Sequence, residues 1–149
     1  MPEMRELYHE LIGDHWKHPR NFGKLESANR QATGYNPLCG DRAIVYLQLE
    51  GGIVQQVQFQ GGCCAICTAS ASLMTQRLKG QTETEAEALF DSFHNMATGG
   101  EIAPGAKDQL GKLLVFSRVK NFPSRVNCAT LPWHTFRAAL RGEPEISLD

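Results

Sequence analysis

The residues best suited to chemistry in this 149-residue chain are its five cysteines, Cys39, Cys63, Cys64, Cys67 and Cys128. An odd number of cysteines in a chain without a secretory signal favours metal ligands or reactive thiols over a disulfide framework. The thiolate of cysteine is both a metal ligand and a nucleophile. The residues around each cysteine therefore have to indicate which chemistry applies.

Cys39 lies in a turn, Asn36-Pro-Leu-Cys-Gly-Asp41, in which Pro37 and Gly40 bracket the cysteine. The side chains of Cys39 and Asp41 are two residues apart, so in an extended backbone both can point to one side. That geometry suits two ligands of one ion. Taken alone, an aspartate after a glycine, as Asp41 is, is most often a turn residue that accepts hydrogen bonds from nearby backbone N–H groups.

Cys64 and Cys128 are each expected just before a helix, over residues 67–79 and 129–141 respectively. Helix N-termini favour anions and lower thiol pKa values, which promotes metal binding or nucleophilic attack. A lone buried cysteine is usually a small hydrophobic residue, so Cys128 is weak evidence by itself. The cysteine segments together are harder to explain as packing.

Cys64-Ala-Ile-Cys67 also has the Cys-x-x-Cys spacing of thioredoxin-like redox sites and zinc knuckles. A redox site expects a βαβ context, whereas an antiparallel hairpin pattern precedes this motif. The sequence has no second Cys-x-x-Cys to complete a four-cysteine knuckle. The dithiol redox interpretation is therefore the less favoured one.

Other polar residues are expected to be structural. Three histidines are predicted to be packed or solvated and not ligands, namely His15, His18 and His134. Three charged residues at the end of the first helix either form a docking surface or are simply solvated, namely Asp14, Lys17 and Arg20.

Hydrophobic periodicity predicts an α+β fold, with a short antiparallel β-sheet of about three strands and helices packed on one side. The chain carries no linker or repeat, so residues 1–149 are expected to form a single domain. Gly51-Gly52 marks the hairpin turn, and Thr82-Glu-Thr-Glu85 fits a capping box. The expected strands are near 33–35 and over 43–49 and 53–59; the expected helices are 3–17, 67–79, 82–93, 107–117 and 129–141.

Composition excludes several classes of protein. The chain is 42% hydrophobic and 21% charged with a net charge of −1, and it has no basic cluster, so nucleic acid is not an expected partner. The longest apolar runs, 43–47 and 113–116, are far shorter than the ~20 residues of a membrane span. The charged N-terminus lacks the apolar core of a secretory signal, which favours a cytoplasmic protein.

Four segments resemble the successive signatures of a known family. They are Asp14-His-Trp-Lys-His-Pro-Arg-Asn-Phe-Gly23, Asn36-Pro-Leu-Cys-Gly-Asp41, Cys64-Ala-Ile-Cys-Thr-Ala-Ser-Ala-Ser-Leu-Met74 and Arg125-Val-Asn-Cys-Ala-Thr-Leu-Pro-Trp133. The chain is similar, nearly end to end, to the U-type iron–sulfur cluster assembly proteins, the SufU/IscU family. The resemblance implies a metal site whose ligands are Cys39, Asp41, Cys64 and Cys128.

The branch within the family is indicated by positions at which this chain differs from the IscU-type scaffolds. IscU-type scaffolds place a His before the last ligand and a Leu-Pro-Pro-Val-Lys segment before that, whereas this chain has Asn127 and Phe122-Pro-Ser-Arg-Val126. An extra stretch, about 93–112, is similar to the SufU insertion. The SufU branch implies a zinc-dependent sulfur acceptor working with a SufS-type cysteine desulfurase and other SUF assembly components.

Further departures concern thiols and charge near the site. Cys63 and Cys67 stand where the family commonly has Gly and Ser, so they could compete for metal or form a disulfide with Cys64. Asn127 stands where SufU relatives often have Lys. Arg125 could offset the negative site or be a surface residue.

The charges of three thiolates, one carboxylate and the zinc ion sum to −2. The hard Asp41 oxygen is the ligand atom that matches the ion least well. A partner's ligand could therefore free a thiolate to attack a persulfide, and Cys39 on its turn is the expected acceptor. One alternative is a scaffold that assembles a [2Fe–2S] cluster, or binds iron, on the same ligands. Another is a binding adaptor with a purely structural zinc.

Overall fold

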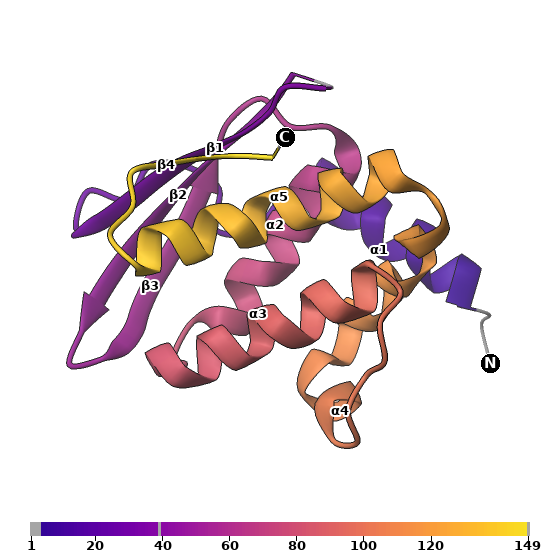
Figure 1. Ribbon diagram of the computed structural model, residues 1–149. Coiled ribbons are helices and arrows are strands. Elements are labelled where there is room, and N and C mark those ends of the chain that lie inside the picture. Colours follow the sequence, from indigo (N-terminus) through magenta and orange to yellow (C-terminus); the bar gives the residue numbers. More distant parts are fainter. Residues whose placement is uncertain (1–3, 39, 149) are drawn as a thin grey trace.

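The computed structural model describes residues 4–38 and 40–148 (Figure 1). Within these residues, no helix is long and apolar enough to cross a membrane. The elements follow the order α1 (Met4–Lys17), β1 (Arg30–Asn36), β2 (Asp41–Glu50), β3 (Ile53–Gln60), α2 (Ala65–Leu78), α3 (Glu83–Ala97), α4 (Ala106–Leu110), the 3-10 segment η1 (Gly111–Asn121), α5 (Pro123–Leu140) and β4 (Glu145–Ser147).

The sheet has the order β3-β2-β1-β4, in which β1–β2 and β2–β3 are antiparallel and β4 pairs parallel with β1. The predicted α+β class is confirmed. Glycines form the β2–β3 turn as expected, because Gly51 and Gly52 have φ angles of 58° and 73° that side chains disfavour. The short β4 adds an edge strand that was not predicted, because three residues carry too little alternation to be recognised.

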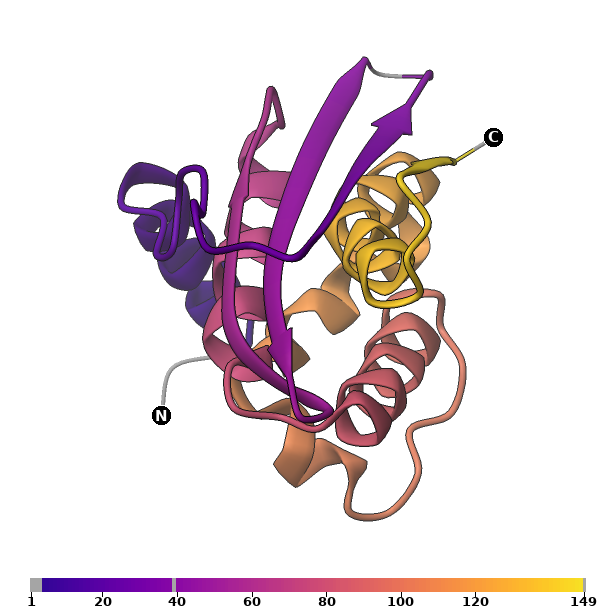
Figure 2. The ribbon, with the colours of Figure 1, turned by 90° about the vertical axis from the view of Figure 1, so that its left-hand side faces the viewer.

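The helices gather on one side of the sheet, as Figures 1 and 2 show, and α2 and α5 contact it directly. The covered face is the buried one: Ala32 lies between more exposed neighbours in β1, as do Ala43 and Val45 around Ile44 in β2, although Tyr46 is buried as well. Burying one face of an antiparallel sheet under helices gives the domain its core.

Two buried hydrogen bonds inside that core hold α2 against α5. The Trp133 indole N–H donates to Ser70 Oγ at 3.1 Å, and Ser70 Oγ in turn donates to the Ala129 carbonyl at 2.6 Å. Trp133 also stacks on Phe93 of α3, with ring centroids 4.4 Å apart. Buried side chains with satisfied hydrogen bonds specify one packing arrangement, so the two helices that carry Cys64 and Cys128 have a defined relative position.

Two helical predictions need correction. The last helix begins at Pro123, six residues earlier than expected. Pro123 occupies the first turn, where backbone N–H groups have no partner within the helix, so the missing N–H of proline costs no hydrogen bond. The helix expected at 107–117 is instead the five-residue α4 followed by η1, because Gly111, the C-cap of α4 and first residue of η1, adopts a φ of 52°. The predicted capping box of α3 is confirmed, with Thr82 and Glu85 exchanging both hydrogen bonds.

Candidate metal centre

Asp41 is positioned by the turn that joins β1 to β2. The buried Asn36 accepts the Leu38 N–H on its side-chain oxygen at 3.3 Å and the Gly40 N–H on its carbonyl at 2.8 Å. Gly40 has a φ of 76°, the left-handed conformation that lets the chain turn back. Asp41 then starts β2 opposite Asn36 and is buried. Cys39, predicted as a ligand and as the acceptor, lies outside the described residues.

The loop from β3 to α2 is fastened beside Asp41. The Arg42 N–H donates to the Gly62 carbonyl at 3.0 Å. Gly61 has a φ of 133°, and a Cβ there would overlap the Arg42 carbonyl oxygen, so only glycine fits this approach of two backbones. The loop ends at Cys64, which is the N-cap of α2, close to the predicted position just before a helix.

Three of the four predicted ligands converge. One oxygen of Asp41 and the sulfurs of Cys64 and Cys128 lie within 4.8 Å of one another, and Cys128 Sγ is 3.6 Å from Asp41 Oδ2. Tetrahedral zinc with Zn–S near 2.3 Å and Zn–O near 2.1 Å requires donors about 3.5–3.8 Å apart. The donor types and the Cys128–Asp41 distance therefore fit zinc. Cys128 reaches the cluster from inside α5, not from before the helix as predicted.

The sulfurs lie on an apolar floor of three fully buried residues, Ala43, Cys67 and Leu131, against which Cys64 and Cys128 pack while partly exposed. Cys64 Sγ accepts the Cys67 N–H at 3.5 Å. The neighbouring Cys128 thiol, more than the Cys67 amide, lowers the pKa of Cys64 to about 7, although burial and Asp41 oppose this. Cys64 therefore ionises more readily than an ordinary cysteine.

The two additional thiols are joined to each other: Cys63 and Cys67 form a disulfide, with Cα atoms 5.4 Å apart. The alternative in which one of these thiols forms a disulfide with Cys64 is therefore wrong, since Cys64 is not in a disulfide. The pair brackets Cys64 in sequence, and Cys67 is fully buried while Cys63 is partly exposed. The spacing of four residues across a helix start is the signal that could have indicated the pairing.

Arg125 and Tyr8 complete the surroundings. Arg125 is exposed, with its guanidinium carbon 4.8 Å from the centroid of the Phe122 ring, which fits the surface interpretation. Tyr8 of α1 was not singled out from the sequence, because an aromatic residue on an apolar helix face resembles any core residue. Burial raises the pKa of Tyr8, opposed by Arg125 and Arg118, and the charges of Cys64 and Cys128 raise it further.

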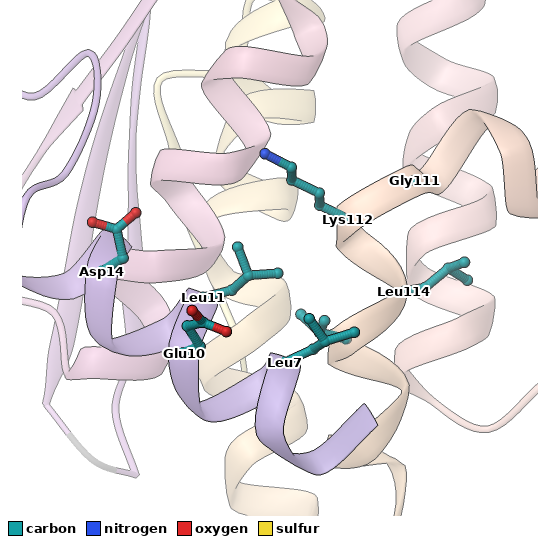
Figure 3. Close-up of a pocket in the computed structure, with 8 residues that line it drawn as sticks. Leu7, Glu10, Leu11, Asp14, Gly111, Lys112 and Leu114 are labelled. Atoms are coloured by element: carbon teal, nitrogen blue, oxygen red, sulfur yellow. The ribbon is translucent and has the colours of Figure 1, made fainter. Parts of the chain in front are cut away.

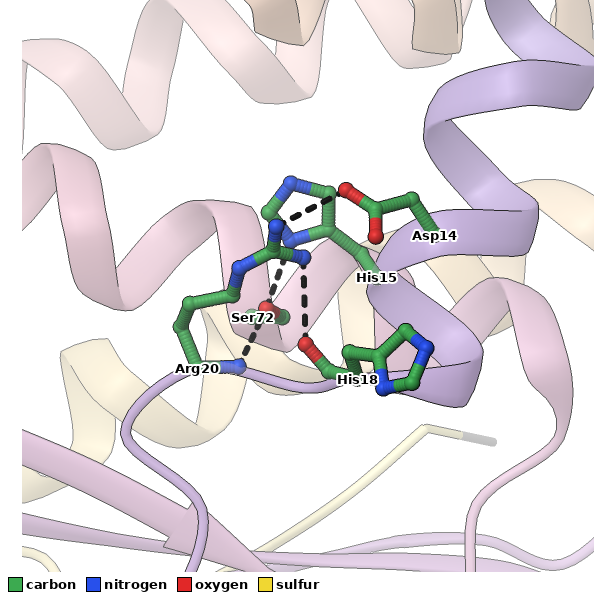
Figure 4. Close-up of polar contacts among 5 residues, drawn as sticks. All are labelled: Asp14, His15, His18, Arg20 and Ser72. Atoms are coloured by element: carbon green, nitrogen blue, oxygen red, sulfur yellow. Dashed lines mark hydrogen bonds and ion pairs between the residues drawn. The ribbon is translucent and has the colours of Figure 1, made fainter.

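A hydrogen-bond network ties the end of α1 to α2 (Figure 4). The hydroxyl of Ser72 bonds His15 Nδ1 at 2.7 Å and accepts the Arg20 backbone N–H at 2.9 Å. Arg20 also pairs with Asp14 at 2.8 Å and donates to the His18 carbonyl at 3.0 Å. The prediction that His15 is packed is confirmed, and Asp14 and Arg20 hold the turn after the helix.

A groove of about 500 Å³ runs between α1 and η1 (Figure 3). Its apolar wall includes Leu7, Leu11 and Leu114, and the charged side chains of Glu10 and Lys112 stand at its sides. None of the residues that line it belongs to the cysteine–aspartate cluster. The cluster is instead half-buried, where the start of β2 meets the N-terminal parts of α2 and α5.

Comparison with known proteins identifies the family of this chain. The family model described as NifU-like N terminal domain matches residues 7–129. This chain belongs to the NifU-like N-terminal domain family. The resemblance to SufU and IscU proteins predicted from the four sequence segments is thereby confirmed.

Curated relatives of this NifU-like domain carry two kinds of name. It is 37% identical over 137 residues to the zinc-dependent sulfurtransferase SufU of Bacillus subtilis, covering 92% of this chain and 91% of the relative. It is 36% identical over 135 residues to the iron–sulfur cluster assembly scaffold protein IscU of Thermotoga maritima, covering 91% and 93%.

Solved structures agree on the fold of this NifU-like domain. A crystal structure from Fervidobacterium islandicum AW-1, described as an iron–sulfur cluster assembly scaffold for the SUF system, superposes with a TM-score of 0.83 at 36% identity, covering 91% of this chain and 98% of that one. A NifU-like N-terminal domain from Brucella abortus superposes at 0.81 with 24% identity, covering 95% and 97%, and supports the fold alone.

Proposed function

We propose that this NifU-like domain serves iron–sulfur cluster assembly as a zinc-binding sulfur acceptor, which receives persulfide sulfur from a SufS-type cysteine desulfurase. The observation that carries the proposal is the convergence of the Asp41, Cys64 and Cys128 donor atoms within 4.8 Å. The Bacillus relative, named a zinc-dependent sulfurtransferase, supports the same reading.

Cys39 is proposed as the fourth ligand, because it stands two residues before Asp41 in the turn that Asn36 and Gly40 close. Zinc bound by these residues would keep their thiols ionised near neutral pH. The mixed donor set distinguishes this site from four-cysteine structural sites.

Sulfur transfer requires an acceptor thiolate on an accessible part of the chain. In the proposed step, the Cys39 thiolate attacks the terminal sulfur of the desulfurase persulfide. A new S–S bond forms on Cys39, the S–S bond of the donor breaks, and the desulfurase cysteine leaves as a thiolate. Leu38, the residue before Cys39 in the sequence, is 81% exposed, so a partner protein can contact Leu38.

The test measures alanine formation by a SufS-type desulfurase with the zinc-loaded wild type and with Cys39→Ser. The wild type should accelerate turnover, and Cys39→Ser should abolish the acceleration while the remaining ligands retain some zinc. Zinc content of each protein is measured in parallel. An unimpaired Cys39→Ser variant would transfer the acceptor role to Cys64 or Cys128.

The second candidate is a scaffold that assembles a [2Fe–2S] cluster on the same residues, which the scaffold name of the Thermotoga relative favours. Thiolates hold iron as well as zinc. Metal analysis and a visible spectrum of protein purified anaerobically separate the two. Zinc without visible absorption supports the acceptor, whereas iron with sulfide and visible bands supports the scaffold.

A further inference from the structure

The Cys63–Cys67 pair has no part in the proposed ligand set, yet it lies against that set. Cys67 is fully buried on the apolar floor and packs beside Cys64, whose sulfur accepts the Cys67 N–H. Cys63 precedes the helix and is partly exposed. Their Cα separation of 5.4 Å lies inside the range, roughly 4.4–6.8 Å, that disulfides ordinarily span. The backbone thus permits both the dithiol and the disulfide.

A dithiol beside a sulfur acceptor can supply the two electrons that sulfur transfer alone does not supply. The outer sulfur of a persulfide must gain two electrons to leave as sulfide, which is the form that combines with iron. Two thiols that become one disulfide release two electrons. A pair able to close within one loop can therefore reduce sulfur where it arrives.

We propose that the Cys63–Cys67 pair releases sulfide from persulfide sulfur brought to this chain; the delivery of that sulfur rests on the proposed function. First, the Cys63 thiolate attacks the terminal sulfur of a donor persulfide, forming Cys63–S–SH and releasing the donor thiolate. Second, the Cys67 thiolate attacks Cys63 Sγ, the Cys63–Cys67 bond forms, and the outer sulfur leaves with its proton as hydrosulfide. A small dithiol returns the pair to the reduced state.

Burial assigns the two roles. The partly exposed Cys63 can meet a donor, whereas Cys67, packed among Ala43 and Leu131, can reach Cys63 but no external sulfur. Cys64 takes no part in the two steps, because its sulfur lies beside Asp41 and Cys128. The disulfide in the structure is the product of the second step.

The experiment uses the full chain, zinc-loaded and fully reduced, with glutathione persulfide as the probe and no other thiol present. The wild type should release sulfide equimolar with the chain and lose two thiols. Trypsin gives one peptide, 43–77, that holds Cys63, Cys64 and Cys67, while Cys39 and Cys128 fall in the peptides 31–42 and 126–137. Alkylation before digestion should label Cys64 and leave Cys63 and Cys67 joined.

The variants identify each role. Cys67→Ser should keep an extra sulfur atom on peptide 43–77 and release roughly tenfold less sulfide, because no thiol expels it. Cys67→Ala repeats the test with an apolar side chain in the buried position. Cys63→Ser should release equally little sulfide without retaining sulfur on that peptide. All three variants should bind as much zinc as the wild type. Wild-type sulfide release by Cys67→Ser and Cys67→Ala, or a disulfide that includes Cys64, would overturn the proposal.

A second arm replaces glutathione persulfide with a SufS-type desulfurase and cysteine. If the chain accelerates alanine formation but releases no sulfide in either arm, the dithiol proposal fails and the proposed function stands. If it releases sulfide from glutathione persulfide but leaves the desulfurase unaffected, the acceptor function fails while the chemistry of the pair stands.

Discussion

Cys128 Sγ lies 3.6 Å from Asp41 Oδ2, which brings the first turns of α5 against the first residue of β2. With Cys64 at the start of α2, the cluster draws on three separate elements. An ion held there would connect the sheet to both helices that cover it. Metal binding is thus expected to contribute to folding as well as to chemistry.

Removing zinc should lower the melting temperature of the protein. A ligand at 100 times its Kd stabilises the native state by about 2.7 kcal/mol, which corresponds to a shift of roughly 5–10 °C for a chain of this size. Thermal unfolding of zinc-loaded and chelator-treated protein under reducing conditions measures the difference. Equal melting temperatures would show that a metal ion at the cluster does not stabilise the packing of α2 and α5 on the sheet.

Replacing Asp41 with cysteine should tighten zinc binding and slow sulfur transfer. Sulfur is a softer and more strongly bound donor than a carboxylate oxygen, so Asp41→Cys makes a four-thiolate site whose ligands exchange slowly. The two measurements are zinc affinity by competition with a chelator and stimulation of desulfurase turnover. Stimulation that stays level or rises would mean that an exchangeable ligand at this position is unnecessary.

Asp41→Ala is the complementary change. It leaves a site of cysteine ligands open to water, so zinc affinity should fall by at least the roughly 10- to 100-fold that loss of an outer-shell partner of a metal ligand costs. The same competition assay measures the change. Zinc affinity equal to that of the wild type would remove Asp41 from the ligand set.

Gly61→Ala should displace the loop that carries Cys64. The added Cβ meets the Arg42 carbonyl oxygen, and the φ of 133° is strained for any side chain, at a cost of about 1–3 kcal/mol. Zinc affinity should fall with stability, since Arg42 adjoins Asp41. Gly62→Ala is the matched control, because a Cβ at Gly62 meets nothing within 4 Å. Equal unfolding free energies for the two variants would refute the close approach.

His134 should make the protein less stable in mild acid. Burial against Phe90, more than the nearby His94 and Arg137, lowers the pKa of His134 to about 4. Below about pH 6.5 the unfolded chain binds a proton at His134 that the folded chain does not bind. The stability contributed by neutral His134 is therefore fully present above that pH, and it is lost as pH falls toward 4 by at most about 1.4 kcal/mol per pH unit.

His134→Phe should remove that part of the acid sensitivity. Urea unfolding of both proteins between pH 7.5 and 4.5 should give free energies that converge or cross in favour of the variant as pH falls. Parallel curves over this range would show that His134 does not govern the acid response.

The elements that the sequence predicted well are those with local signals. The double glycine at 51–52 requires a turn, Thr82 and Glu85 satisfy each other's backbone N–H groups within one helical turn, and alternation identifies the buried face of β2. The candidate ligands Asp41, Cys64 and Cys128 were also identified by residue type and by resemblance. The turn, the capping box and the strand depend on residues only a few positions apart.

Tertiary structure decided what depends on distant contacts. The packing of Trp133 on Ser70 and Phe93 sets how α5 lies on α2, and so brings Cys128 to Asp41 from within a helix. The choice of Cys67 as the partner of Cys63 follows from where the helix begins. Pattern within the sequence fixes local hydrogen bonds and burial, whereas the spacing of side chains on different elements exists only once those elements are packed together.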